Sequence, residues 1–175
     1  NKAVGVDGVS VEEYGTSLRS NVSKLIDSMK SKSWRPQPVR RVYIPKPGKS
    51  EKRPLGIPAT EDKLVQMAVK KILESIFEGE FLDCSHGLRP SRSCHTAIKG
   101  LNACMMKRPV NFIVEVDIRR FFDNVSHYWL QRCLEEKISD PNMIWIIRKL
   151  LKAGVMIDGV WDATSVGTPQ GAIVS

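Results

Sequence analysis

Apolar residues recur at helical spacing near the start of the chain. Ser10 is followed three residues later by Glu13, a capping-box pattern that predicts the beginning of a helix. The apolar positions that continue this helix are Leu18, Val22, Leu25, Ile26 and Met29. We therefore expect a first helix that runs to about Lys32.

The pattern changes after Trp34 and the prolines at positions 36 and 38, which end the helix. Residues 39–44, with the sequence VRRVYI, suit an exposed β-ribbon. Turn-forming residues follow in PKPGKSEKR, so the ribbon should fold back as a projecting hairpin. The basic residues expected around its tip are Lys46, Lys49, Lys52 and Arg53.

The middle of the chain is predicted to be helical. Thr60 is a suitable N-cap for a second helix, and Ser91 is expected to start a third. The apolar stripe of the second helix is Leu64, Met67, Ala68, Ile72 and Ile76, and the third helix carries Ile98, Leu101 and Met105. The loop DCSHGLRPSRS connects them.

A strand is predicted next. The segment NFIVEVD, residues 111–117, is apolar on both faces near its middle, which is typical of a strand at the centre of a sheet. Asp117 lies at the carboxyl end of this strand. The strand would place one carboxylate at the edge of a sheet.

Two helices and a hairpin complete the pattern. Ser126 is expected to cap one helix, and Asp140, with Pro141 at the first helical position, opens another that stops at Gly154. The dipeptide Asp158-Gly159, flanked by VMI and VW, predicts a two-residue hairpin turn. Helices and strands are thus mixed, and the predicted fold class is α+β.

Composition adds a charge argument. With 42% hydrophobic residues, the 175-residue chain is long enough for one core or for two small lobes. Lys and Arg outnumber Asp and Glu by 27 to 19, which gives a net charge of +8 and favours a polyanionic partner. A basic surface with no such partner is the alternative.

The remaining composition argues against a zinc site and a membrane span. The four cysteines form no C-x-x-C pair, and the three histidines do not supply close pairs either, so we expect reduced, intracellular thiols and no structural metal. No apolar run reaches the roughly 18 residues that a membrane span requires. Asn1 is not an initiator Met and the sequence stops within TPQGAIVS, so we expect both ends to be cut from a longer protein.

Three segments could carry chemistry. In VEVDIRRFFDNVSH, the Asp117 carboxylate is a natural ligand for Mg²⁺, and the Ile118 carbonyl could add a second oxygen; the alternative is a turn-capping Asp beside core aromatics. In VGTPQGAIVS, Gly167 and Gly171 would let the backbone approach a ligand, or form an ordinary loop. The basic hairpin is either a clamp on phosphates or a solvated surface.

Together these segments resemble the conserved blocks of group II intron reverse transcriptases. The blocks are, in order, IPKPG…RPLGIP, HGLRPSRSCHTAI, VEVDIRRFFDNVSH and GTPQGAIVS. The opening GVDGVS resembles the short N-terminal extension of that family, so the resemblance covers nearly the whole chain. It implies a right-hand polymerase fold, with fingers in residues 1–110 and a partial palm in residues 111–175.

The resemblance also implies roles for single residues. Asp117 would bind both catalytic Mg²⁺ ions, with the Ile118 carbonyl assisting, and Phe122 would lie beneath the incoming sugar and exclude a 2′-hydroxyl. The triphosphate would contact Lys46 and Arg53, and the nascent base pair or sugar would contact Gln170. The residues expected to face the template RNA are Arg89, Arg92, Lys49 and Lys52.

The implied function is an RNA-directed DNA polymerase that extends a DNA primer with dNTPs and also serves as a maturase that binds intron RNA. The family block with two adjacent Asp residues lies beyond Ser175, so we expect the 175-residue chain alone not to polymerise. A splicing factor with a degenerate polymerase and another bacterial reverse transcriptase remain as alternatives, whereas Phe122 disfavours an RNA-directed RNA polymerase. The expected location is the bacterial cytoplasm, away from membranes, and a homodimer is left open.

Overall fold

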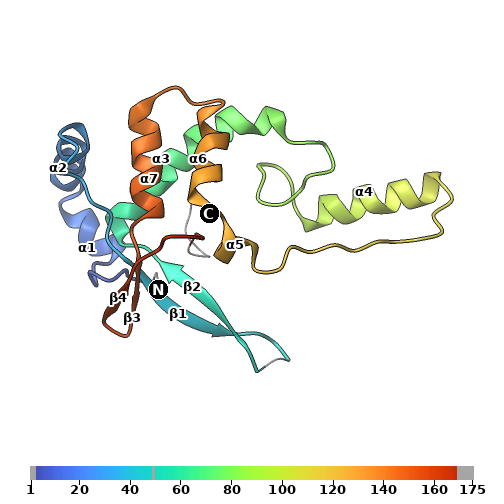
Figure 1. Cartoon of the computed structure of the whole chain (residues 1–175), viewed down its shortest axis with the longest axis horizontal. Helices are drawn as coiled ribbons and strands as arrows, with labels where there is room; N and C mark the ends of the chain where they lie inside the picture. Colours follow the sequence, from blue (N-terminus) through green and yellow to red (C-terminus); the bar gives the residue numbers. More distant parts are fainter. Residues whose placement is uncertain (1–2, 49, 169–175) are drawn as a thin grey trace. The chain divides into compact units, whose positions relative to one another are not determined.

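The computed structural model describes residues 3–48 and 50–168 of the chain. In this part of the chain, helices and strands follow one another in mixed order, which confirms the predicted α+β class (Figure 1). The chain forms two compact units. The first unit contains residues 1–71 and 120–175, and the second contains residues 72–119.

The predicted first helix is in fact two helices, α1 (Val11–Thr16) and α2 (Leu18–Lys30). The Ser10 hydroxyl accepts a hydrogen bond from the Glu13 N–H at 3.0 Å, as the capping pattern predicted. Ser17 interrupts the helix because its φ of −125° and ψ of 36° lie outside the helical region. The break follows Gly15 and Thr16, two residues with low helix propensity.

Both predicted hairpins are present and lie in one sheet of the first unit. Strand β1 (Val39–Pro45) pairs antiparallel with β2 (Lys52–Ile57), and β3 (Val155–Ile157) pairs antiparallel with β4 (Val160–Asp162). The sheet order is β2-β1-β3-β4, with β1 and β3 parallel. Asp158 and Gly159 have φ values of 48° and 84°, as a two-residue turn of type I′ requires.

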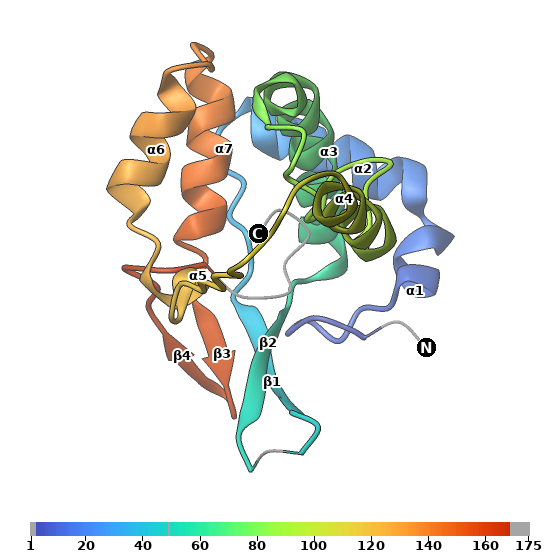
Figure 2. The same cartoon turned by 90° about the vertical axis from the view of Figure 1, so that its right-hand side faces the viewer.

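Helices α6 (His127–Glu135) and α7 (Pro141–Leu151) contact each other in the first unit and lie side by side in Figure 2. Their predicted N-caps are confirmed: the Ser126 and Asp140 side chains accept backbone N–H groups of Trp129 and Asn142. The buried apolar residues of this unit are Leu25, Trp34, Val39, Ile57, Ala59, Val65, Val69, Leu134, Ile138, Met143, Ile144, Ile147, Leu150 and Val155.

Helix α3 (Thr60–Phe77) begins at the predicted residue, but its buried face is not the predicted stripe. Leu64, Met67 and Ile72 are between 39% and 51% exposed, whereas Val65 and Val69 are buried. Both sets have helical spacing, so periodicity alone could not choose between them. The surface against which a helix packs decides which of its faces is buried.

The second unit contains the end of α3, a short 3-10 helix, η1 (Glu78–Glu80), and α4 (Cys94–Lys107). Helix α4 starts at Cys94, not near Ser91. Ser93 caps it and makes a reciprocal pair of hydrogen bonds with Thr96. None of the buried apolar residues falls within residues 72–119, all of which are described.

The predicted strand at residues 111–117 is wrong. This segment is extended chain without secondary structure, and Phe112, Ile113, Val114 and Val116 are each at least 75% exposed. A strand exists only where a neighbouring strand supplies its hydrogen bonds, and no strand in the described residues pairs with this segment.

The N-terminal segment is fixed to the first unit through its backbone carbonyl groups. Arg40 donates two hydrogen bonds to the Val4 carbonyl, at 2.8 and 3.0 Å, and Lys63 donates one to the Ala3 carbonyl at 2.8 Å. Gly5 allows this approach because a Cβ there would lie 2.4 Å from the Ala59 Cα. Since these contacts use carbonyl groups, they constrain the backbone more than the side chains of the segment.

Among the described residues, no helix combines the length and apolar character needed to cross a bilayer. The four cysteines are all free.

Asp62 is a buried carboxyl group in the first turn of α3, with only 4% of the residue exposed. It accepts a hydrogen bond from the Gln37 N–H at 2.8 Å. Burial raises the pKa of Asp62 to about 7, and the nearby carboxylates of Glu61 and Asp7 raise it further, although the Gln37 N–H opposes them. Near neutral pH this group therefore changes charge.

Asp62 should make the stability of the fold depend on pH. Its folded pKa of about 7 is above the ordinary 3.8, so its stabilising effect is complete below about pH 3.8 and is lost as pH rises through 7. We expect Asp62→Asn, which keeps an oxygen acceptor for Gln37, to raise stability near pH 8 by up to about 4 kcal/mol and to have little effect near pH 4. Thermal unfolding followed by circular dichroism at both pH values measures this. An equal shift at both would contradict the assignment.

Candidate nucleotide and template site

Two of the sequence motifs meet in the first unit. The short helix α5 (Phe121–Asn124) belongs to the RRFFDNVSH motif, and residues 166–168 begin the GTPQG motif. The Thr168 N–H donates to the Phe122 carbonyl at 2.7 Å, and the Gly167 N–H donates to the Val125 carbonyl at 2.9 Å. A ring nitrogen of His127 lies 2.6 Å from the Gly167 carbonyl.

Gly167 is required for this contact. Its φ of +82° is unfavourable for other residues, and a Cβ there would lie 2.7 Å from the Asp123 carbonyl oxygen and 2.8 Å from that of Phe122. The sequence had suggested that this glycine lets the backbone approach a ligand. In the structure it lets the backbone of one motif approach that of the other.

The geometry around Phe122 is set by its own short helix. Arg120, just before the helix, has a left-handed backbone with φ 50° and ψ 44°, and its carbonyl accepts a hydrogen bond from the Asn124 side chain at 2.8 Å. The rings of Phe121 and Phe122 meet edge to face with centroids 5.5 Å apart. Phe122 as a whole residue is half-buried.

Asp117 and Ile118 lie in the second unit, in the exposed segment without secondary structure. Their carboxylate and carbonyl oxygens are hard donors of the kind Mg²⁺ prefers. Within the part of the chain that is described, however, no three His, Cys, Asp or Glu side chains are grouped closely enough to hold a metal ion. Metal binding at Asp117 would therefore need further oxygen donors beside it.

The basic hairpin carries its charges at the end of the β1–β2 ribbon. Lys46 forms an ion pair with Glu51 at 2.9 Å, and its backbone N–H donates to the Glu51 carbonyl at 3.2 Å. Lys52 and Arg53 are exposed, and Arg53 lies opposite Ile44 in the ribbon. The Lys46–Glu51 pair is on the surface, where such pairs contribute about 0–1 kcal/mol, so a phosphate could displace Glu51 at little cost.

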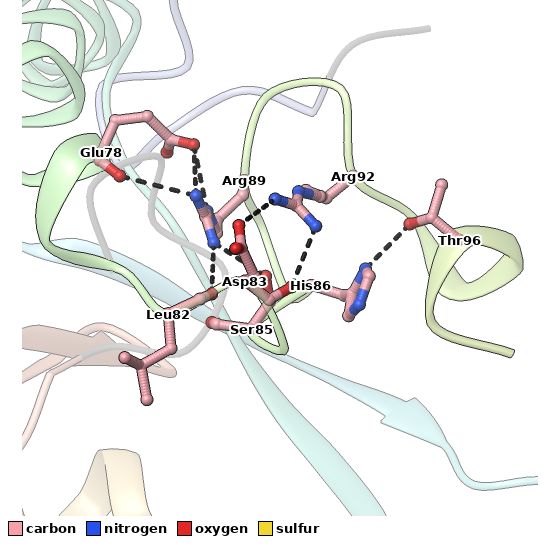
Figure 3. A network of polar contacts seen from close by, with 8 residues as sticks. All are labelled: Glu78, Leu82, Asp83, Ser85, His86, Arg89, Arg92 and Thr96. Atoms are coloured by element: carbon pink, nitrogen blue, oxygen red, sulfur yellow. Dashed lines mark hydrogen bonds and ion pairs between the residues drawn. The ribbon is translucent and has the colours of Figure 1, made fainter. Parts of the chain in front are cut away.

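Arg89 has internal partners in the second unit (Figure 3). Its side chain is 7% exposed and donates to the Glu78 carboxylate at 2.8 and 3.0 Å, and to the carbonyls of Leu82 and Ser85 at 2.8 and 3.0 Å. The guanidinium also lies 5.2 Å from the centre of the Phe81 ring. Arg89 therefore holds together the loop that follows η1.

Arg92 is more available than Arg89. It contacts the carbonyl and carboxylate of Asp83 at 2.9 and 3.3 Å, but 29% of its side chain is exposed. His86 extends the same network by a hydrogen bond to Thr96 at 2.9 Å (Figure 3). The sequence did not predict that the arginines of this basic loop donate hydrogen bonds to the loop itself. Backbone carbonyl acceptors are present at every residue, so a residue pattern does not reveal which of them are used.

Two of the expected site residues, Lys49 and Gln170, lie outside the described residues. Of the others, the structure brings Phe122 together with the start of the GTPQG motif. Lys46, Lys52 and Arg53 lie on one hairpin, and Arg89 and Arg92 lie in one loop. The sequence thus predicted which residues are grouped locally, but not the contact between the two motifs.

The comparison with known proteins identifies the class. The sequence model of the family described as "Reverse transcriptase (RNA-dependent DNA polymerase)" matches residues 44–175, so the chain belongs to the reverse transcriptase family. The predicted resemblance to group II intron proteins is also confirmed. The chain is 43% identical, over its whole length, to the group II intron-encoded protein LtrA of Lactococcus lactis subsp. cremoris, of which it spans 29%.

Two further relatives extend this similarity. The chain is 38% identical to protein YkfC of Escherichia coli (strain K12), over 98% of the chain and 45% of that protein. It is 29% identical to nuclear intron maturase 1, mitochondrial, of Arabidopsis thaliana, over 54% of the chain and 13% of that protein. In each case the chain spans less than half the length of the relative.

Gly167→Ala should separate the two motifs. The new methyl group would meet two carbonyl oxygens in addition to the backbone strain, so we expect a loss of stability of about 2–3 kcal/mol. Gly159→Ala is a matched control, since Gly159 has a φ of +84° but open space around it, and it should lose only about 1 kcal/mol. Thermal unfolding of both variants measures the difference. Equal losses would mean that the close approach at Gly167 is unimportant.

Arg89→Lys should loosen the loop of the second unit. Lysine has a single nitrogen and cannot reach the Glu78 carboxylate and the two carbonyls at once, so we expect a loss of about 2 kcal/mol in local stability. Hydrogen exchange of residues 78–93 reports it, with Arg92→Lys as a control that should change little. Unchanged exchange together with weaker RNA binding would instead assign Arg89 mainly to template contact.

Proposed function

We propose that the intact protein is the RNA-directed DNA polymerase of a bacterial group II intron, which extends a DNA primer with dNTPs on an RNA template. The contact between α5 and the Gly167–Thr168 turn carries this proposal, because it joins two of the motifs that resemble blocks of the group II intron reverse transcriptases. Membership in the reverse transcriptase family and the similarity to the intron-encoded LtrA support it.

Phe122 would act by its shape. The residue is half-buried, and its ring packs against Phe121. Its backbone carbonyl accepts a hydrogen bond from the Thr168 N–H. A ring fixed in this way can lie under the sugar of an incoming nucleotide and leave no room for a 2′-hydroxyl. Gln170, two residues beyond Thr168, would contact the nascent base pair from the minor-groove side.

Asp117 and the Ile118 carbonyl would supply oxygen ligands to Mg²⁺. The metal, when bound, would stabilise the negative charge that develops as the new phosphodiester bond forms. Asp117 is fully open to such a ligand, since its segment is exposed along its whole length. The remaining ligands would come from other carboxylates and from the nucleotide phosphates.

The hairpin would hold the triphosphate and the template. Lys46 and Arg53 would make charge-assisted hydrogen bonds to the triphosphate, which keep it in line for attack. Lys46 is available for this since its pair with Glu51 is a weak surface contact. Lys49 and Lys52 on the hairpin, with Arg89 and Arg92 in the loop of the second unit, would face the RNA template.

A maturase role is the second candidate, and the similarity to a protein named as an intron maturase favours it. The net charge of +8 suits an RNA partner. In this role the same protein would bind its intron RNA and assist splicing. We further propose that residues 1–110 are the fingers and residues 111–175 part of the palm, and that the protein acts in the bacterial cytoplasm.

Primer extension with Mg²⁺ on an RNA template tests the polymerase proposal. The intact protein should make DNA, and Asp117→Asn should reduce the rate at least 100-fold because it removes the metal-binding charge. Glu115→Gln is a matched control, since it removes one carboxylate two residues away in the same exposed segment, and it should keep near-normal activity. If the intact protein made no DNA but still bound intron RNA, the splicing role alone would remain.

A further inference from the structure

A basic groove runs along α7 in the first unit. One cavity of about 400 Å³ is lined by Arg35, Trp145, Arg148, Lys149 and Lys152, together with two small residues. A second cavity of about 300 Å³ shares Arg148 and Lys152 and extends towards His127, Tyr128 and Gln131 of α6. Because the two cavities share Arg148 and Lys152, they adjoin each other, and we call the pair the α7 groove.

The amphipathic pattern of α7 explains part of this arrangement. Met143, Ile144, Ile147 and Leu150 are buried, so the positions between them face outward. Trp145 is followed by Arg148 three residues later and by Lys149 four residues later, and Lys152 comes at the same spacing after them. This row of side chains extends over about 10 Å of the helix. Cations at the end of a helix also interact favourably with its dipole. Helix stability alone could therefore account for Arg148, Lys149 and Lys152.

Arg35 has no such explanation, since it comes from the segment between α2 and β1. Its guanidinium donates to the carbonyls of Lys32 and Trp34 at 3.2 and 3.1 Å. The neighbouring Trp34 is buried and meets the Trp145 ring edge-on, with centroids 6.1 Å apart. These contacts fix a fourth cation at the groove from a distant part of the sequence.

The four cations have no acidic partner in the described part of the chain. The Arg148 Nε donates to the Gln131 side chain at 3.0 Å, and Lys149 lies 5.9 Å from the centre of the Trp145 ring. Both contacts are with uncharged groups. Elsewhere in the described residues, Lys46, Arg89, Arg92 and Arg132 each form an ion pair. Four like charges gathered without a carboxylate repel one another, and an anionic ligand relieves that repulsion.

We propose that the α7 groove binds the phosphate backbone of RNA, at a site separate from that of the nucleotide. The groove is a row of charges with an extension towards α6, which suits several successive phosphates better than one small anion. The identification of the polyanion as RNA rests on the proposed function. No residue assigned to the nucleotide or the template lines the groove.

Such binding depends on charge and not on base sequence. Lys149 lies against the Trp145 ring, so the groove presents cations to phosphates more than it presents an open ring to bases. Contacts of this kind position RNA without reading its sequence, and their affinity falls steeply with salt. The groove would hold a distant part of a long RNA while the polymerase site holds the template end.

A matched pair of charge variants of the intact protein tests the proposal. Arg35→Gln with Lys152→Gln removes two charges from the groove, and Arg19→Gln with Lys24→Gln removes two from the exposed face of α2. Binding of a fluorescein-labelled RNA of mixed sequence is measured by anisotropy at several salt concentrations. We expect the groove variant to bind roughly tenfold more weakly and its salt slope to fall by about two, with little change in the α2 variant.

A rescue variant and a second polyanion complete the test. Arg35→Lys with Lys152→Arg keeps both charges and should restore RNA binding, whereas a purely structural role of Arg35 would leave binding impaired. Equal weakening by the groove and α2 variants would show an effect of net charge alone and overturn the proposal. The proposal would also be overturned if the groove variant lost affinity for labelled poly-glutamate but kept its affinity for RNA, because the site would then suit an acidic peptide.

The proposal for the groove and the proposal for the polymerase can be tested separately. On a short preformed primer–template, the groove variant should extend the primer at the rate of the intact protein, because none of the residues assigned to the nucleotide is changed. If no version of the protein makes DNA, the proposed polymerase function fails, and the RNA-binding comparison still decides the groove.

Discussion

Strands β1 and β3 are joined by two parallel residue pairs, Val39 with Val155 and Arg40 with Met156. This pairing connects the start of the basic ribbon to the strand that follows α7. The Val39 N–H also donates to the Gly154 carbonyl at 3.0 Å, which extends this join to the end of the α7 segment. Because of it, two hairpins that are far apart in the sequence form one sheet. The root of the ribbon, the end of α7 and the chain around Arg35 are thereby held in one unit.

Polar contacts to backbone carbonyls fix much of what surrounds this sheet. Arg40 and Lys63 hold the N-terminal segment through its carbonyl groups, and Thr168 holds α5 through the Phe122 carbonyl. Arg89 does the same for the loop of the second unit. Such contacts define a backbone path without much buried apolar surface, and the second unit, which has no buried apolar residue, depends on them most.

Elements with a local signal could be predicted from the sequence. The caps at Ser10, Ser126 and Asp140 use side chains that bond within three residues, and the Asp158-Gly159 turn needs only two residues with positive φ. The strand at residues 111–117 could not be settled in this way. Its apolar residues favour a strand, but a strand needs a neighbour, and nothing in the segment itself specifies one.

The sequence by itself determined the family of this protein, the order of its motifs and the residues that could carry charge or bind a metal. Residue identity and spacing are enough for that, because each block carries its chemistry within a few neighbouring positions. Only the tertiary structure decided that Val65 and Val69 form the buried face of α3, that Gly167 meets the carbonyls of α5, and that Arg89 turns inward. It also decided that Arg35 joins the cations of α7. These outcomes depend on contacts between residues far apart in the chain, and many alternative contacts are compatible with the same local pattern.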